Sequence, residues 1–497
     1  MYSCIKSAAN LGLEGYLVKV ETHISNGLPR FKIVGLPDKS VEEAKDRVTS
    51  AIKSSGYTFP LKRITVNLAP SNIPKHGPSF DLPIATGILY ASNQITIKKP
   101  EAIEQAMFSG ELGLNGKLRA TNATPIIVHT AAKNKIPRVI LPSSNLDEYF
   151  HEKDIEILLP VSLRDCIEFL KGNRKLSRYT PTQNSSKSSS VNTDLPPIIG
   201  NHSAKRAAAI TIAGRHHLAL SGTPGCGKTL LAKSMIAFMP EPSMNELFEI
   251  HKIYSICKEK CPTSRPFRNP HHSSSMISIL GGGAIPVPGE VTLSHHGILF
   301  LDEFQEFQQK TINSLRQPLE DHSITISRKY ATVTFPCNFI LVTAMNLCPC
   351  GFLGHPNKQC TCKYHQIVNY RNKIPNALWD RIDLHINLFP QNFKSITKIE
   401  SDKDIRHYHK LILDTWDIQK HRGTFNNTIT LSKSKKLCPT SARAGLLLKN
   451  SYKTLGMSTR GLLKILRVAR TIADIDNVEI IKERHIAEAV SYRRISC

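Results

Sequence analysis

The sequence predicts an α/β protein of several domains, with a mixed α+β domain first, an α/β domain with a parallel sheet next, and helices at the end. Three observations support this prediction. A glycine-rich loop stands between an apolar strand and a helix, strand and helix patterns alternate after that loop, and a serine-rich segment separates this region from a strand-rich one. A chain of 497 residues is too long for one ordinary core, so we expect about three domains.

Residues 1–171 are predicted to form the α+β domain. The segments RFKIVGL, KRITVNLAP and RVILP have the length and the β-branched content of short strands. Residues 40–55 place Val41, Ala44, Val48 and Ile52 at helical spacing. Residues 172–197 follow, reading GNRKLSRYTPTQNSSKSSSVNTDLPP, and their polar, serine-rich composition is typical of a flexible linker.

Residues 198–392 are predicted to form the domain with the parallel sheet. Apolar strands are expected at 217–221, 298–301 and 339–344, in alternation with helices. Strand patterns fade in residues 393–497, where helical spacing dominates and predicts a helical lid. The strongest such helix carries Leu462, Leu463, Leu466, Ala469 and Ala473.

A phosphate-binding loop is predicted at residues 222–229, GTPGCGKT, which fit the pattern G-x-x-x-x-G-K-[ST] between a strand and a helix. Its glycines let backbone N–H groups turn toward phosphates, and the N-terminus of the helix favours negative charge. Lys228 is expected to reach the β- and γ-phosphates of ATP, and Thr229 to bind Mg²⁺. The predicted nucleotide-binding residues are Gly222, Thr223, Pro224, Gly225, Cys226, Gly227, Lys228 and Thr229.

Two further strands are predicted to end in the groups that hydrolyse ATP. The segment GILFLDE at 297–303 is uniformly apolar before its two acids, which indicates a strand buried on both faces. Asp302 is expected to hold the magnesium ion, and Glu303 to orient and polarise the attacking water. The strand FILVTAMN ends in Asn346, whose side chain is placed to help position the same water.

The charge balance indicates a polyanionic partner. The chain has 65 Lys or Arg against 40 Asp or Glu, a net charge of +25, and residues 394–497 alone hold 21 basic against 10 acidic residues. Such an excess attracts nucleic acid, although a generally basic proteome is an alternative cause. No apolar run approaches the ~18 residues of a membrane helix. The first 19 residues contain Asn10, Glu14 and Lys19 where a signal peptide is apolar, so we expect a cytoplasmic protein.

Four of the twelve cysteines form a cluster, C-x-C-x9-C-x-C, made by Cys348, Cys350, Cys360 and Cys362. In a reducing compartment, clustered cysteines indicate a metal site more often than disulfides. A structural zinc ion would hold together the loop LCPCGFLGHPNKQCTCKYH, which has little apolar content of its own. Free thiols, and another metal or a redox use, are the alternatives.

The segment ITISRKYATVTF at 324–335 predicts a β-hairpin with Arg328 and Lys329 at its tip. In a ring of subunits, such a tip would grip a phosphate backbone without reading its sequence. An ordinary hairpin with a solvated tip is the alternative. The segment FRNPHHSSS and the glycines at 281–283 indicate a second mobile loop with residues that can contact phosphate.

With these motifs in order, the sequence resembles the Mg-chelatase-like AAA+ family of bacteria, in its ComM (YifB) group. The resemblance covers nearly the whole chain. It implies a domain similar to the proteolytic domain of Lon over 1–171, an AAA+ ATPase domain over 198–392, and an Mg-chelatase-type helical lid over 393–497. The motifs that carry it are VGLPDKSVEEAKDRV, KRITVNLAPSNIPKHGPSFDLPIA, PFRNPHHSSS, LGGGAIPVPGEVTLSHHGILFLDE, AMNLCPCG and LWDRIDLHI.

The resemblance also implies roles for single residues and an assembly. Asn346 corresponds to sensor 1, Arg460 to sensor 2, and Arg381 to an arginine finger that reaches into the site of a neighbouring subunit, which requires a ring, in this family a hexamer. The implied activity is ATP-driven branch migration of DNA during the uptake of foreign DNA. A chelatase-type motor that remodels a protein partner for metal insertion is the second hypothesis, and a non-motor scaffold is the third.

In the implied Lon-like domain, Ser79 stands within PKHGPSFD, where Lon has its nucleophile. The segment expected to carry the partner lysine, LRATNATPIIVHTAAKN, has none before Lys133, which lies too close to the following strand. A serine hydroxyl without a base is a poor nucleophile. We therefore expect a scaffold domain without proteolytic activity.

Overall fold

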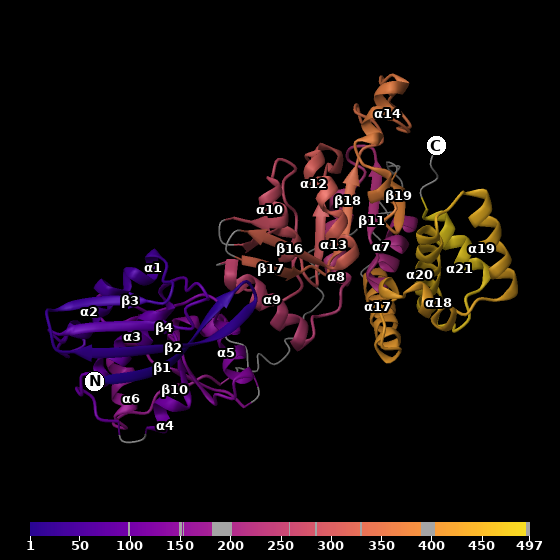
Figure 1. Cartoon of the computed structure of the whole chain (residues 1–497). Coiled ribbons are helices and arrows are strands. Elements are labelled where there is room, and N and C mark those ends of the chain that lie inside the picture. Colours follow the sequence, from indigo (N-terminus) through magenta and orange to yellow (C-terminus); the bar gives the residue numbers. More distant parts are fainter. Residues whose placement is uncertain are drawn as a thin grey trace. The chain divides into compact units, whose positions relative to one another are not determined.

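The computed structural model describes residues 1–97, 100–148, 152, 154–180, 201–257, 259–283, 286–328, 331–388 and 403–493. The chain divides into two compact units (Figure 1). The first contains Met1–Ser186 with the short segments Phe248–Pro262 and Lys329–Val333, and the second contains the remainder. Most of the predicted linker, 181–197, and the hairpin-tip residue Lys329 lie outside the described residues.

The first unit contains an eight-stranded sheet of mixed direction, in the order β10-β9-β8-β5-β1-β2-β4-β3. The predicted strands RFKIVGL, KRITVNLAP and RVILP are confirmed as β3, β4 and β8. The sequence analysis missed the long antiparallel hairpin of β1 and β2, which forms the middle of the sheet. The strands are β1 (Tyr2–Leu11), β2 (Glu14–Ser25), β3 (Arg30–Val34), β4 (Arg63–Ala69), β5 (Ala106–Phe108), β8 (Arg138–Ile140), β9 (Glu156–Leu159) and β10 (Ser177–Arg178).

Helices pack on this sheet, and a short pair, β6 (Glu111–Leu112) with β7 (Leu118–Arg119), stands beside it. The predicted helix at 40–55 is two helices that meet at Glu43, and its four apolar positions are buried as expected. The helices are α1 (Lys39–Glu42), α2 (Ala44–Ser54), α3 (Asp81–Ala91), α4 (Glu101–Glu104), α5 (Thr124–Lys133) and α6 (Leu163–Leu170), with 3-10 turns η1 (Pro78–Phe80) and η2 (Ser143–Glu148).

The second unit contains a five-stranded sheet in the order β12-β15-β18-β11-β19, parallel at every pairing. The predicted parallel sheet is therefore confirmed, and every residue of β15 and β18 is buried. The strands are β11 (Leu218–Gly222), β12 (Phe267–Arg268), β15 (Ile298–Leu301), β18 (Ile340–Met345) and β19 (Leu384–Leu388).

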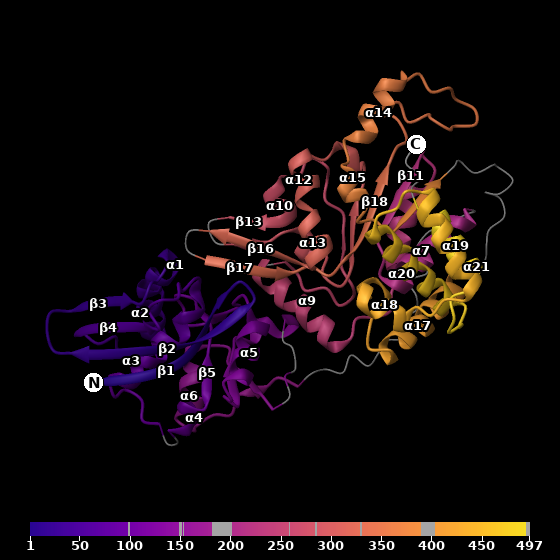
Figure 2. The same ribbon diagram turned by 45° about the vertical axis from the view of Figure 1, so that its right-hand side comes forward.

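Shorter elements complete this part of the chain, and β16 with β17 forms the two-stranded hairpin predicted at 324–335. Most of α9 and the first half of β17 belong to the first unit. In the view of Figure 2, α14 stands at the top of the part that holds the parallel sheet. These elements are α7 (His202–Gly214), α8 (Lys228–Phe238), α9 (Met244–Cys257), α10 (Met276–Leu280), β13 (Gly281–Gly282), β14 (Val287–Pro288), α11 (Glu290–Leu293), η3 (Phe304–Glu306), α12 (Gln309–Ser314), α13 (Arg316–Asp321), β16 (Ser323–Arg328), β17 (Ala331–Pro336), α14 (Tyr364–Asn372) and α15 (Asn376–Trp379).

The C-terminal part of the second unit is helical and packs against α7 and β19. Trp416 donates a hydrogen bond to the carbonyl of Ile212 at 3.0 Å, and the backbone N–H of His385 donates to Tyr492 at 2.8 Å. Among the described residues, no helix has both the length and the hydropathy needed to cross a bilayer. The helices are α17 (Lys403–His421), η4 (Asn426–Thr428), α18 (Leu431–Leu437), α19 (Ala442–Thr454), α20 (Thr459–Ile475) and α21 (Glu483–Ser491).

The predicted lid helix is α20, but its buried face differs from the predicted one. Ala469 and Ala473 are buried, whereas Leu462, Leu463 and Leu466 are only half-buried. The core side is completed by Ile465, Val468 and Ile472. The leucines near the start of the helix lie at its margin because the buried stripe runs through Ile465 instead.

Candidate active site

The predicted phosphate loop joins β11, which lies between β18 and β19, to helix α8. Gly225 and Gly227 have φ of +79° and +88°, a left-handed backbone that favours glycine, and Gly227 caps α8. At Gly222 a Cβ atom would lie 2.4 Å from the carbonyl oxygen of Leu388. The glycines therefore allow both the turn and the close approach of β19.

Lys228 lies at the first position of α8 with its ammonium group folded back over the loop. Its Nζ donates hydrogen bonds to the carbonyl oxygens of Gly222 at 2.9 Å and Thr223 at 3.0 Å, and to Oδ1 of Asn346 at 3.1 Å. Burial lowers the pKa of Lys228. A longer contact of 3.9 Å joins Nζ to Sγ of Cys226. Because its oxygen acceptors are neutral, an anionic phosphate is a stronger partner for this ammonium group.

Thr229 and Asp302 face each other across the same site. The Thr229 hydroxyl donates to Oδ2 of Asp302 at 2.8 Å, and the other Asp302 oxygen accepts from the backbone N–H of Glu303 at 2.9 Å. A hydroxyl beside a carboxylate is an oxygen donor set of the kind that Mg²⁺ prefers. The buried hydroxyl of Thr223 has no hydrogen-bond partner among the described residues, which leaves a polar group of the loop available to a ligand.

Asn346 follows β18, which lies between β15 and β11, so it stands between Lys228 and Asp302 along the sheet edge. Its carbonyl oxygen accepts a hydrogen bond from Gln305 at 3.2 Å, while its side chain accepts from Lys228. The three strand ends thus bring together the residues that the sequence analysis assigned to phosphate, metal and water.

Glu303 has a neighbour that the sequence analysis missed. Nδ1 of His272 lies 3.1 Å from Oε2 of Glu303, and Glu303 itself has a φ of +50°. A left-handed backbone is uncommon for a residue with a side chain and here aims the carboxylate. A signal was available in the sequence: His272 follows β12, and the carboxyl ends of neighbouring parallel strands meet at one sheet edge.

The two predicted arginines lie together, and they share one carboxylate. Arg381 binds Oε2 of Glu320 at 2.7 Å, and Arg460 binds Oε1 of the same side chain at 3.0 Å. Arg381 also donates to the carbonyl of Ala377, and its Nε has no partner among the described residues. Within the described part of the chain, no hydrogen bond or ion pair joins either arginine to residues 222–229.

A buried ion pair fixes the position of these arginines relative to the sheet. Nζ of Lys464, one turn after Arg460 on α20, donates to the carbonyl of Arg381 at 2.6 Å and to Oδ1 of Asp383 at 2.7 Å. The other Asp383 oxygen accepts from the backbone N–H of His217 at 2.9 Å, at the start of β11. The lid helix is therefore joined to the strand that carries the phosphate loop.

The four clustered cysteines lie in the loop between β18 and α14, and their sulfur atoms all lie within 4.8 Å of one another. The Sγ–Sγ distance is 3.4 Å from Cys348 to Cys350, 3.5 Å from Cys350 to Cys360, and 3.6 Å from Cys360 to Cys348. Tetrahedral zinc with bonds of ~2.3 Å separates its sulfur ligands by roughly 3.8 Å, so the cluster fits that ion. A backbone N–H of Phe352 lowers the pKa of the Cys350 thiol to about 5, which favours a thiolate.

The hairpin tip and the second loop lie close together. Arg328 is exposed at the end of β16, and its Nε donates to the carbonyl oxygen of Gly283 at 3.2 Å. Gly283 belongs to the glycine run that the sequence analysis assigned to the second loop.

In the first unit, Ser79 lies in η1, half-buried, and its carbonyl oxygen accepts from Gly110 at 2.9 Å. Lys133 ends α5, and among the described residues no hydrogen bond joins it to Ser79. Lys75, a lysine outside the segment expected to carry the partner of Ser79, is fully buried and donates to the carbonyl of Pro70. No hydrogen bond joins Lys75 to Ser79 either in the part of the chain that the structure describes.

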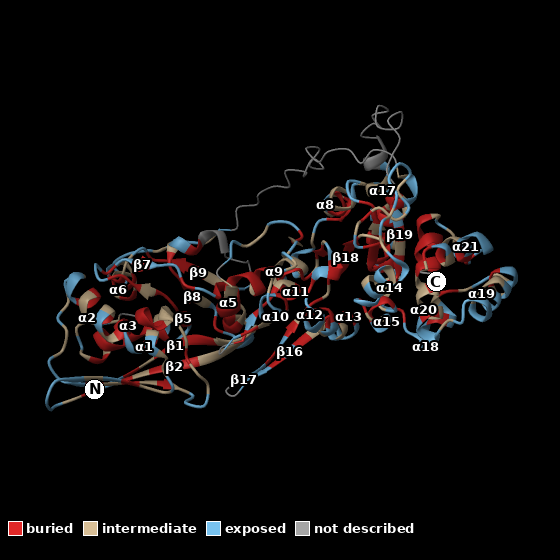
Figure 3. Ribbon diagram, turned by 90° about the horizontal axis from the view of Figure 1, so that it is seen from above, coloured by how far each residue is buried: buried red, intermediate tan, exposed pale blue. Residues whose placement is uncertain are grey.

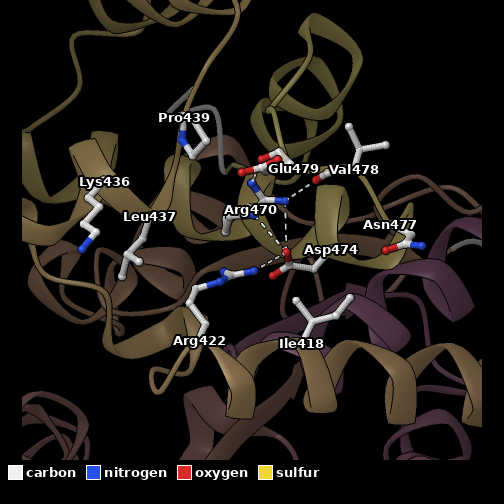
Figure 4. Close-up of a pocket in the computed structure, with 10 residues that line it drawn as sticks. All are labelled: Ile418, Arg422, Lys436, Leu437, Pro439, Arg470, Asp474, Asn477, Val478 and Glu479. Atoms are coloured by element: carbon white, nitrogen blue, oxygen red, sulfur yellow. Dashed lines mark hydrogen bonds and ion pairs between the residues drawn. The ribbon is translucent and has the colours of Figure 1, made fainter.

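A separate cavity of about 410 Å³ opens in the lid between α17, α18 and α20 (Figure 4). Three of its charged side chains bind one another: Asp474 accepts from Arg422 at 2.6 Å and from Arg470 at 3.0 Å. Arg470 also donates to the carbonyls of Val478 and Glu479. These contacts stabilise the end of α20, and they leave few donors for a ligand.

Comparison with protein families matches three consecutive regions of the chain. Residues 20–145 match the family described as subunit ChlI of Mg-chelatase, residues 194–396 match magnesium chelatase, subunit ChlI, and residues 403–493 match its C-terminal family.

Three proteins illustrate the range of similarity. The chain is 38% identical to YifB of Escherichia coli over 99% of this chain and 97% of that protein. It is 39% identical to the competence protein ComM of Haemophilus influenzae over 98% of this chain and 97% of that protein. A Lon protease of Mesomycoplasma hyopneumoniae is 30% identical over 164 residues, which is 32% of this chain and 18% of the protease.

Proposed function

Because this chain belongs to the Mg-chelatase-like AAA+ family, in the group of YifB and ComM, we propose that it is a ring-forming ATPase that migrates branched DNA in the cytoplasm. The observation that carries the ATPase part is the convergence of Lys228, Thr229, Asp302, Glu303 and Asn346 at the carboxyl edge of three neighbouring parallel strands. The groups expected to bind phosphate, metal and the attacking water therefore lie together in one site at that edge.

In the proposed reaction, Lys228 exchanges its neutral oxygen partners for the β- and γ-phosphate oxygens of ATP. Thr229 and Asp302 would hold Mg²⁺, which would supply positive charge to neutralise the phosphates. Glu303 accepts the proton of the attacking water, and Asn346, whose Oδ1 already binds Lys228, keeps that water between lysine and carboxylate.

We assign Arg381 to the site of a neighbouring subunit in a hexameric ring, and Arg460 to the role of sensor 2. The shared Glu320 carboxylate supports a joint role, because both guanidinium groups bind the same carboxylate on α13. An arginine supplied in trans stabilises charge on the transferring phosphoryl group. The proposed enzyme is therefore complete only when subunits assemble.

The cysteine cluster is proposed to hold a structural zinc ion. The support is the fit of the sulfur separations to tetrahedral geometry and the position of the loop beside the nucleotide site. A Cβ atom at Gly351 would lie 2.8 Å from Cγ of Pro224, so the cysteine loop packs directly on the phosphate loop.

DNA is the proposed substrate of the motor. The support is the net charge of +25, the exposed Arg328 at the hairpin tip, and the similarity to a protein named for competence. Lys329 is assigned the same role as Arg328. The match to magnesium chelatase families supports a second candidate, a motor that remodels a protein partner for metal insertion.

A synthetic four-way DNA junction tests the proposal. The native chain with ATP and Mg²⁺ is expected to convert the junction into two duplexes, whereas Lys228→Ala and Glu303→Gln are expected to leave it intact. Glu303→Gln should still bind nucleotide. An ATPase that leaves the junction unchanged, and is stimulated only by a protein partner, would establish the second candidate instead.

A further inference from the structure

The sheet of the first unit has one face covered by helices and another that stays open over β1 to β4. Ile5, Val20 and Val66 are fully buried on the covered face, where α3 packs against β1 and β2 (Figure 3). On the other face, the apolar cluster that contains α5 includes Ala8 and Leu17, near the hairpin end. Alternation along each strand then assigns the remaining side chains of that face to solvent.

The strand register gathers cations on this open face. Residues directly opposite one another across a strand pair point to the same side. Lys6 lies opposite Lys19, and Arg63 lies opposite both Ser25 on β2 and Arg30 on β3. Lys32 lies opposite Thr65 in the next row. The open-face cations are Lys6, Lys19, Arg30, Lys32 and Arg63.

These cations lack carboxylate partners. Among the described residues, none of the five open-face cations forms an ion pair, and Lys6 donates only to the backbone carbonyl of Glu104 at 2.5 Å. The acid on the strands of this face is Glu21, which accepts a hydrogen bond from Asn67 at 2.8 Å and is also hydrogen-bonded to Tyr2. Beside the strands, exposed Glu104 of α4 lies next to Lys6. The face therefore keeps a strong positive field that favours a polyanion.

Apolar and aromatic groups lie among the open-face cations. Tyr2 is 62% exposed and lies opposite His23, between the row of Lys19 and the row of Arg63. Leu28, two residues before Arg30, is 89% exposed, and Leu61, two residues before Arg63, is 82% exposed. A surface that combines cations with an exposed aromatic ring suits a strand whose bases are free to stack.

We propose that the open face of β1 to β4 binds single-stranded DNA, with phosphates on the five open-face cations and a base on Tyr2. Along β2, the row of Lys19 and the row of Arg63 are six residues apart, a distance of ~20 Å that accommodates several nucleotides. A duplex fits less well because its bases are stacked inside and its major groove admits a helix or a narrow ribbon, not a broad sheet. The choice of DNA rests on the proposed function.

The test measures the affinity of the full chain, without nucleotide, for a fluorescent twenty-residue oligothymidylate. Fluorescence anisotropy gives this affinity at each of several salt concentrations. The variant Lys19→Glu/Lys32→Glu/Arg63→Glu is expected to bind at least about tenfold more weakly. The slope of log affinity against log salt concentration is expected to fall in magnitude by about 2, because three single-strand phosphate contacts are lost. The matched control Lys39→Glu/Lys45→Glu/Lys53→Glu makes the same charge change on α1 and α2 and is expected to bind within about twofold of the native chain.

Tyr2→Ala separates base stacking from charge. It should weaken oligothymidylate binding at least about fivefold and leave binding of inorganic polyphosphate unchanged. Equal loss in the two triple variants would overturn the proposal. The proposal would also be overturned if the open-face variant lost binding to phosphatidylserine vesicles but kept oligothymidylate binding. A preference of the native chain for oligouridylate over oligothymidylate would overturn it too.

The inference and the proposed function fail in distinguishable ways. Lys228→Ala should bind oligothymidylate like the native chain because the open face lies in the other unit, and the open-face variant should keep the basal ATPase rate. If the four-way junction stays intact while the open-face variant still loses oligothymidylate binding, the motor proposal fails and the binding surface stands. If the junction is processed and both triple variants bind equally, the surface proposal fails alone.

Discussion

Nδ1 of His272 lies 3.1 Å from Oε2 of Glu303, so an imidazole already binds the carboxylate that is proposed to activate water. His272 belongs to the loop after β12, and that loop also contains the exposed His271 and Ser273. The contact ties the position of the carboxylate to the conformation of a surface loop.

Removal of this contact is expected to raise the basal ATPase rate. An exposed pair of this kind contributes about 0.2–1 kcal/mol, so His272→Ala should accelerate turnover about 1.4- to 5-fold if Glu303 is released toward the water. Steady-state phosphate release measures the change. His271→Ala is the control, because Nδ1 of His271 binds Ser273 instead. A fall in rate to the level of Glu303→Gln would mean that His272 is needed to hold the carboxylate in place.

Arg381→Ala is expected to assemble and bind ATP but to hydrolyse it about 10³-fold more slowly, as for other trans-acting arginines. Mixing it with Lys228→Ala should restore part of the activity, because an intact phosphate loop then meets an intact Arg381 across a subunit boundary. Glu320→Gln provides the control that keeps both arginines. Rings that form from the mixture and remain inactive would contradict an action in trans.

Protein purified without chelator is expected to contain about one zinc per chain. Cys350→Ser should lose this metal and lower the ATPase rate, since the cysteine loop begins two residues after Asn346 and packs on Pro224. Cys4→Ser, in the first unit, should change neither quantity. A zinc content below about half an equivalent in the native protein would favour free thiols instead.

Stability is expected to fall as the pH drops from about 6.5 toward 4, because burial lowers the pKa of His216 to about 4 and that of His217 to about 3. Unfolded histidines titrate near 6.5, so below that pH the unfolded chain binds more protons, and each buried imidazole costs about 1.4 kcal/mol per pH unit. Thermal melting between pH 7 and 5 measures the slope. His216→Gln should reduce it, whereas replacement of the exposed His421 should not.

Much of the second unit could be predicted because its signals are local. The strand at 298–301 is uniformly apolar since both its faces are buried, and the structure confirms it residue for residue as β15. In contrast, β1 and β2 were missed although they carry alternating burial. Their residues include lysines, asparagine and small side chains, and the hairpin depends on packing against α3.

The sequence by itself determined the family, the parallel sheet, and the phosphate loop with the acids and the asparagine at the strand ends, because these depend on backbone conformation and on spacing along short segments. Only the tertiary structure decided that Arg381 and Arg460 share Glu320, that His272 meets Glu303, and that five cations gather on the open face. Each of these joins residues that are distant in the sequence. Strand order, register and helix packing bring them together, and none of those is encoded in any single segment.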